Sequence, residues 1–479
     1  MFDIPDMLSC STTSRRTLLQ SAGCGFGWLA WNALAAQEAH ASPQGPRLPH
    51  HAPAAKRIIF LFMQGGPSQV DTFDYKPRLE KDDGQELPFD DARAIANTQS
   101  RGTRQRVLKS PWKFAQHGDS GRWVSELFPH VAQHVDDLCF LHGVHTEGVA
   151  HGPATLFLHC GSTNLIRPSI GSWISYGLGT ENDNLPAFVS IAPSWGNGGA
   201  RNFGPAFLPA AHQGTALGKA GSPATEATIR NLDNARHSLA ARRRQFDLIR
   251  ELNAAQRGAQ PGESELDAVI ESYELARRMQ TGIPGILDLA SESASTQALY
   301  GIGEKPTDNF GRQCLLARRL CEAGVRYTQV TYGDNTANPA WDQHSNLPKH
   351  ADHAQAVDRP IAGLLADLKQ RGLLEDTLVW WGSEFGRTPY AEKNGTGRDH
   401  NPEGFTMWLA GGGVRPGFAY GATDEFGHQA ISGRLHVRDV HATLLHLLGL
   451  DHERLTWRYS GRDFRLTDVA GQVADEIVN

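Results

Sequence analysis

The chain has 479 residues, 40% of them hydrophobic, and its formal net charge at pH 7 is −6. That hydrophobic content is ample for a sizeable core, arranged as one large domain or two. The acidic balance argues against a nucleic-acid partner, because such partners require a basic surface. The cysteines show no CxxC spacing, which argues against a cysteine-bound metal.

The N-terminus has the pattern of a twin-arginine export signal, which we predict for residues 1–36. Ser14-Arg15-Arg16-Thr17-Leu18-Leu19-Gln20 precedes an apolar stretch that ends in the small-x-small cleavage signature Ala33-Leu34-Ala35. The stretch is too short and too mildly apolar for a membrane span. Cys24 leaves a lipoprotein as the alternative, although Ser21 stands where a lipoprotein signal has an aliphatic residue. We therefore predict a periplasmic or extracellular protein with no transmembrane anchor after signal removal.

Residues 37–56 are predicted to form a linker rich in Pro, Ala and His, and residues 57–479 the folded part. Apolar runs alternate with helical patterns, which is typical of a mostly parallel, doubly wound α/β sheet. Between residues 224 and 294 the sequence is charged and helical, which predicts a helical insertion. Strands are expected at 58–63, 138–141, 187–191, 325–330, 377–381 and 405–409, and helices at 310–323, 360–371 and 439–448.

Carboxylates and imidazoles gather between residues 341 and 404. Oxygen and nitrogen donors of this kind hold divalent metals, and we expect zinc, manganese or calcium. The apolar run at 377–381 leads into Glu384, which should lie just past the carboxyl end of a buried strand, where open α/β sheets place their ligand sites. The candidate ligands are Asp342, His344, Glu384, Asp399 and His400.

Three further residues are candidates for catalysis. Arg387 could clamp an anionic group through its planar fork. Ser68, at the turn after the first strand, is a candidate nucleophile, and His151, at a predicted helix start, is a candidate ligand or acid/base group. Simpler alternatives exist: Glu384 with Arg387 as an ion pair, and His151 as a structural histidine.

Motifs over nearly the whole predicted mature chain resemble the exported family called domain of unknown function 1501, within the alkaline phosphatase and sulfatase superfamily. They include FMQGGPSQVDTFDYKP at 62–77, GLLEDTLVWWGSEFGRTP at 372–389 and GRDHNPEGF at 397–405. The stretch HVRDVHATLLHLLGLD at 436–451 is similar to the closing helix of sulfatases. The resemblance implies an alkaline phosphatase-like domain at 57–479, interrupted by the helical insertion.

The chain departs from the superfamily pattern at two positions. Gln64 stands where superfamily hydrolases have a metal-binding aspartate after the first strand. His151 stands where they have the nucleophile. The resemblance thus implies one complete metal site and a second that has lost ligands. The positions that match superfamily ligands are Asp342, His344, Glu384 and His400.

Two functions of different class are therefore predicted. The first is a metal-dependent hydrolase of sulfate or phosphate esters, acting on an anionic small molecule or an anionic polysaccharide ester. The second is a catalytically inactive relative that binds an anionic glycan or a partner protein. The altered nucleophile and first-strand positions favour the second, whereas the retained ligands favour the first.

Overall fold

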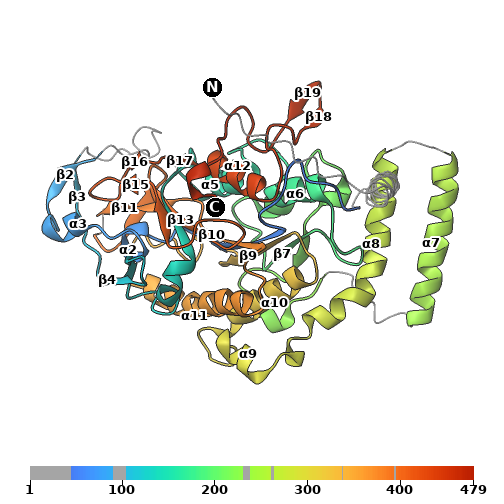
Figure 1. Ribbon diagram of the computed structural model, residues 1–479, viewed down its shortest axis with the longest axis horizontal. Coiled ribbons are helices and arrows are strands. Elements are labelled where there is room, and N and C mark those ends of the chain that lie inside the picture. Colours follow the sequence, from blue (N-terminus) through green and yellow to red (C-terminus); the bar gives the residue numbers. More distant parts are fainter. Residues whose placement is uncertain (1–44, 90–103, 230–237, 260–263, 337, 393–394) are drawn as a thin grey trace, which may run out of the picture.

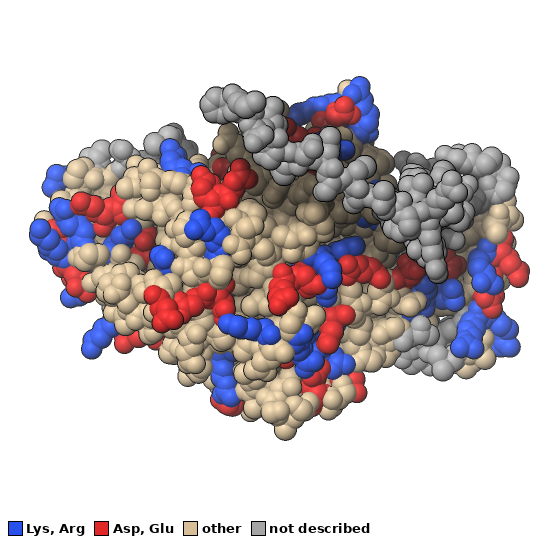
Figure 2. All heavy atoms as spheres, viewed as in Figure 1, with Lys and Arg blue, Asp and Glu red and all other residues tan. Residues whose placement is uncertain are grey.

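The computed structural model describes residues 45–89, 104–229, 238–259, 264–336, 338–392 and 395–479. The predicted export signal, at 1–36, lies outside these residues. No helix among the described residues is both long and apolar enough to cross a membrane. On the face drawn in Figure 2, positive and negative side chains are interspersed over the described surface.

A nine-stranded sheet forms the centre of the molecule, in the order β14-β6-β13-β10-β1-β9-β7-β8, with β17 also paired to β6. The five strands from β10 to β8 are parallel, while β13 is antiparallel to both of its neighbours. The predicted fold class, an α/β protein with a mostly parallel, doubly wound sheet, is confirmed. The nine strands are β1 (Arg57–Met63), β6 (Leu138–His145), β7 (Phe188–Ile191), β8 (Thr215–Leu217), β9 (Tyr327–Tyr332), β10 (Thr377–Gly382), β13 (Phe405–Ala410), β14 (Phe418–Tyr420) and β17 (Leu435–His436).

Helices cover both faces of the sheet (Figure 1). Every residue of β1 is buried. Because successive side chains point to opposite faces, Ile59 and Leu61 join one core while Ile58 and Phe60 join the other. Helices α10 (Asp308–Glu322) and α11 (Lys349–Gln370) cover the first face, and α5 (His151–Cys160), α6 (Ile170–Leu178) and α12 (Val437–Leu447) cover the second.

Two long helices lie in the stretch where the insertion was predicted, α7 (Leu239–Ala259) and α8 (Ser264–Leu287). They stand side by side at one end of the sheet, where α8 is the nearer to the body (Figure 1). Met279 and Ile283 of α8 are buried in the same core as α10 and α11. The insertion is therefore packed onto the domain through α8.

A fully buried ion pair connects the turn after β1 to the segment that carries His400. Arg398 Nε lies 2.7 Å from Asp71 Oδ2, and neither side chain is exposed. Asp71 belongs to α2 (Gln69–Thr72), and Arg398 begins β12 (Arg398–Asn401), which pairs with β11 (Gly386–Ala391). Arg398 also donates to the main-chain oxygens of Thr388 and Leu108. The pair therefore fixes β12 against the first turn of the sheet.

We predict that Arg398→Met destabilises the protein by about 3–5 kcal/mol, because the buried Asp71 carboxylate loses its only cationic partner among the described residues. Equilibrium unfolding in urea measures this change. The matched control is Arg458→Ala, which removes an ion pair to Asp463 in which both side chains are more than half exposed. The control should change stability by about 1 kcal/mol or less. Equal effects of the two substitutions would contradict the structural role of the Asp71–Arg398 pair.

Candidate metal centre

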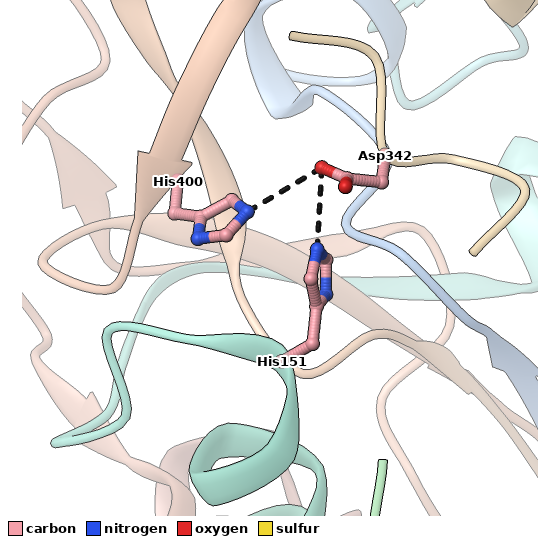
Figure 3. Close-up of side chains that lie close together, drawn as sticks. All are labelled: His151, Asp342 and His400. Atoms are coloured by element: carbon pink, nitrogen blue, oxygen red, sulfur yellow. Dashed lines mark hydrogen bonds and ion pairs between the residues drawn. The ribbon is translucent and has the colours of Figure 1, made fainter. Parts of the chain in front are cut away.

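Three imidazole nitrogens converge on one carboxylate oxygen past the carboxyl ends of β1 and β10. Asp342 Oδ1 lies 2.9 Å from His344 Nε2, 3.2 Å from His151 Nε2 and 3.4 Å from His400 Nε2. The Nε2 atoms of His344 and His400 are 3.0 Å apart. Figure 3 shows His151 and His400 pointing at Asp342 from two different segments of the chain. We call Asp342, His151, His344 and His400 the three-histidine cluster.

Three separate segments supply the cluster. His151 is the first residue of α5, His400 lies in β12, and Asp342 and His344 lie in the loop after β9. The loop can approach the end of β1 because residue 65 is glycine. With φ at +114°, a Cβ at Gly65 would lie 2.8 Å from the main-chain nitrogens of Trp341 and Asp342. Any side chain there would push Asp342 away from the histidines.

The other ring nitrogen of each histidine, Nδ1, donates a hydrogen bond to an oxygen outside the cluster. The acceptors are Glu384 for His151 (2.7 Å), the Glu392 carboxylate for His344 and the Val149 carbonyl for His400 (3.0 Å). Since these oxygens only accept, we assign a proton to each Nδ1. The Nε2 atoms then face the centre of the cluster. This arrangement, with one nitrogen oriented by an oxygen and the other aimed inward, is typical of histidines that bind metals.

The donor atoms fit a nitrogen-rich divalent cation. A tetrahedral zinc ion at about 2.0–2.1 Å from its ligands separates them by roughly 3.3 Å, close to the spacings in the cluster. A neutral imidazole with its proton on Nδ1 turns the lone pair of Nε2 toward the lone pairs of Asp342 Oδ1, and these repel one another. A cation between them removes this conflict. Calcium fits poorly because it takes oxygen ligands, whereas zinc and manganese accept imidazole.

The ionisation of the cluster agrees with this chemistry. Burial lowers the pKa of His400 to about 3, so its imidazole is neutral at pH 7. Burial raises the pKa of Asp342, but hydrogen bonds from His151, His344 and His400 and the charge of Arg387 hold it well below its usual range. Burial lowers the pKa of His344, yet its hydrogen bonds to Asp342 and Glu392 outweigh burial and raise it to about 9. Without a cation, a proton on His344 supplies the positive charge that the centre needs.

Glu384 and Asp399, both predicted as ligands, lie behind the histidine rings. Glu384 is fully buried, and it accepts from His151 Nδ1, from the main-chain nitrogen of Gly65 at 3.0 Å and from the Ser383 hydroxyl at 2.6 Å. Asp399 accepts from the His400 main-chain nitrogen at 2.8 Å and lies 3.7 Å from His344 Nδ1. Both carboxylates therefore support histidines of the cluster from outside it and do not point into its centre. Donor atoms of His344, Asp399 and His400 also lie within 4.8 Å of one another, as do those of His151, Asp342 and His400.

Arg387 lies beneath Asp342 and does not face outward, in contrast to the anion clamp that the sequence suggested. Its Nη2 lies 2.7 Å from Asp342 Oδ1, and its Nε donates to the Gly66 carbonyl at 2.9 Å. The same fork donates to the carbonyls of Gly65 and Arg398. Because the guanidinium is buried and bonded to the protein on every edge, it positions Asp342 and does not bind an external anion.

Ser68, the predicted nucleophile, is also buried and bonded within the fold. Its hydroxyl donates to Asp71 Oδ2 at 2.5 Å, and its main-chain nitrogen donates to His350 Nε2 at 3.1 Å. The hydroxyl therefore belongs to the network of the Asp71–Arg398 ion pair. The structure brings His151, Asp342, His344 and His400 together and leaves Ser68 out of the cluster.

Glu392 and Val149, which support His344 and His400, had no signal in the sequence. Glu392 lies 48 residues from His344, and Val149 lies 251 residues from His400. Neither residue stands in a motif of ligand type. Gln64, the first residue after β1, is fully buried, and neither of its amide atoms has a hydrogen-bond partner among the described residues.

The fold and the cluster define an α/β protein with a candidate metal centre. The family model described as "Protein of unknown function (DUF1501)" matches residues 55–478, so the chain belongs to that family, as its motifs predicted. No curated protein matches the chain.

Among solved structures, the chain is similar to the PsFucS1 sulfatase from Pseudoalteromonas sp., with a TM-score of 0.38 and 12% identity, covering 83% of this chain and 68% of that one. A TAB5 alkaline phosphatase mutant with bound Mg gives a TM-score of 0.34 and 13% identity, covering 83% of this chain and 99% of that one. The lipoteichoic acid synthase LtaP from Listeria monocytogenes gives 0.33 and 10%, covering 88% and 78%.

We predict that Glu384→Gln lowers zinc affinity by about 10–100-fold, because the amide no longer holds the His151 ring as a carboxylate does. Competition with a chromophoric chelator measures the affinity. The control is Glu375→Gln, an exposed residue just before β10, which should bind zinc as the wild type does. Unchanged affinity in Glu384→Gln would show that this carboxylate does not support the centre.

Proposed function

We propose that this protein is an exported, metal-dependent hydrolase of sulfate or phosphate esters. The observation that carries the proposal is the convergence of three imidazole nitrogens on Asp342 Oδ1. Such a set of donors is stable when a cation is shared among them. The substrates are anionic esters, on small molecules or on polysaccharides.

Asp342, His344 and His400 hold the cation in this proposal. Their donor atoms form a compact triangle with sides of 2.9, 3.0 and 3.4 Å. The side chain of His344 is 28% exposed, while those of Asp342 and His400 are nearly buried. The open side of the centre therefore lies beside His344. When bound, zinc or manganese supplies a Lewis acid that polarises an ester oxygen and activates water.

His151 moves the proton in this proposal. Burial lowers its pKa, but hydrogen bonds to Asp342 and Glu384 outweigh burial and raise the pKa above its ordinary value. A histidine held between two carboxylates can give a proton to the oxygen of a leaving group. Glu384 on Nδ1 fixes the ring, so that Nε2 faces the reacting group. Three protein ligands leave a fourth position open, as catalytic metal sites require.

Export is proposed from the twin-arginine pattern at residues 14–20 and the small-residue cleavage signature at 33–35. Twin-arginine export carries proteins that are already folded, often with their cofactor loaded. A centre built from three distant segments of the chain, which forms only when the sheet is complete, suits that route. We place the mature protein in the periplasm or outside the cell.

The test measures metal content and turnover in the same samples of exported, folded protein. We expect about one zinc or manganese ion per chain in the wild type, lost in Asp342→Ala and in His400→Ala. His151→Ala should keep the metal but hydrolyse aryl sulfate or aryl phosphate at least about 100-fold more slowly, because it lacks the proton donor.

The matched control is His212→Ala, which removes a buried histidine bonded to Ser175 and outside the cluster. It should keep both metal and turnover. A wild type that binds neither zinc nor manganese would overturn the metal centre, and turnover that survives Asp342→Ala would overturn its role in catalysis.

Two observations favour a second function, in which the protein binds a ligand without hydrolysing it. The Ser68 hydroxyl is engaged, and His151 Nε2 lies close enough to Asp342 to act as a fourth metal ligand. Four protein ligands make a closed, structural site. The protein would then bind an anionic glycan or a partner without hydrolysis. In the same experiment this function predicts loss of metal in His151→Ala and no turnover in any variant.

A further inference from the structure

A groove lies past the carboxyl ends of β9, β7 and β8, on the same edge of the sheet as the three-histidine cluster. Two adjoining cavities, of about 360 and 400 Å³, share Ser222 and Pro223 as lining residues. The first reaches Tyr332 and Gly333 at the carboxyl end of β9, and the second runs along the edge strand β8, from Thr215 at its start to Gly218 just past its end. Since neighbouring strands lie about 4.8 Å apart, the groove begins within roughly 10 Å of the end of β1.

The lining combines an aromatic surface with cations and amides. Trp195 is 49% exposed and lines the groove at its outer end. Lys219 and Lys305 line the outer and inner cavities, and neither forms an ion pair with a described residue. Asn309 and Asp308 stand on the inner wall. Covering a half-exposed indole with a flat apolar face stabilises a complex, because apolar surface is removed from water. Amides and carboxylates bind hydroxyl groups, and ammonium groups bind anions.

One loop joins the groove to the cluster. Asn335 accepts from the main-chain nitrogen of Trp195 at 2.9 Å and donates to the Ala220 carbonyl at 2.5 Å. The Ser194 hydroxyl donates to the Asp334 carbonyl at 3.0 Å. This loop after β9 continues to Asp342 of the cluster. The wall that presents Trp195 and the ligand of the candidate centre therefore belong to one connected structure.

We propose that this groove binds an oligosaccharide that carries anionic groups, with a sugar ring on Trp195 and the anions at Lys219 and Lys305. A sugar has both the C–H face that an indole covers and the hydroxyls that the inner wall can bind. This inference specifies the substrate class of the proposed function as a charged glycan. Its relevance to catalysis therefore rests on the proposed function. Binding in the groove does not itself require the cation.

The test is calorimetric titration of the exported, full-length protein with a sulfated galactan hexasaccharide and with its desulfated form. We expect the sulfated ligand to bind, and the desulfated ligand to bind at least about tenfold more weakly, because it cannot pair with the lysines. Trp195→Ala and, separately, Lys219→Gln should each weaken binding of the sulfated ligand by about tenfold or more.

The matched control is Trp123→Ala, which removes a tryptophan that is 40% exposed and packs on Tyr75 away from the groove. It should bind as the wild type does. Asp342→Ala should also keep the affinity within about threefold, which separates the groove from the candidate centre. Failure of the proposed hydrolase would leave this result unchanged.

Several outcomes overturn the proposal. These are no binding by the wild type, equal binding of both hexasaccharides, equal loss in Trp123→Ala and Trp195→Ala, and loss of binding in Asp342→Ala.

Discussion

The buried guanidinium of Arg387 is the group on which the candidate centre depends. It donates to the carbonyls of Gly65 and Gly66 after β1, to the carbonyl of Arg398 in β12 and to the Asp342 carboxylate. A buried cation without partners is strongly unfavourable, so these segments are stable only when they meet around it. The position of Asp342, and with it the point where the histidines converge, follows from that requirement.

The parallel part of the sheet explains why the centre and the groove lie side by side. Strands β10, β1, β9, β7 and β8 all end at one edge. Loops leave that edge in succession and can meet there, as open α/β sheets generally allow. The first two strand ends carry Glu384 and the glycine turn, and the last three border the groove. The candidate centre and the groove therefore lie along the same edge of the sheet.

The histidine rings of the cluster are held rigidly, and its centre requires a positive charge. The Nδ1 of each of the three histidines is held by Glu384, Glu392 or the Val149 carbonyl, so the rings cannot rotate away from Asp342 without losing a hydrogen bond. Preorganised donors of this kind lose little entropy when they bind a cation. The same arrangement is unfavourable without positive charge at its middle, because lone pairs then face one another. Occupancy by a cation and formation of the site should therefore be coupled.

The sequence by itself indicated the sheet class and the main strands, although helix α11 begins at Lys349, well before the predicted start at residue 360. The apolar runs at 58–63 and 377–381 are strands β1 and β10, and the pattern at 310–323 is helix α10, each within about two residues. Such patterns are local, since burial on both faces requires unbroken apolar runs. The sequence also singled out Asp342, His344 and His400, which the structure places together.

Only the tertiary structure decided what each polar side chain contacts. Arg387 faces inward, Ser68 is bonded to Asp71, Glu384 lies behind His151, and Glu392 supports His344. These contacts span up to 233 residues, as between His151 and Glu384. A residue type states which bonds a side chain can make, but its partner depends on the direction in which the folded backbone points it. That direction is a property of the packed sheet and its loops, and no local pattern in the sequence encodes it.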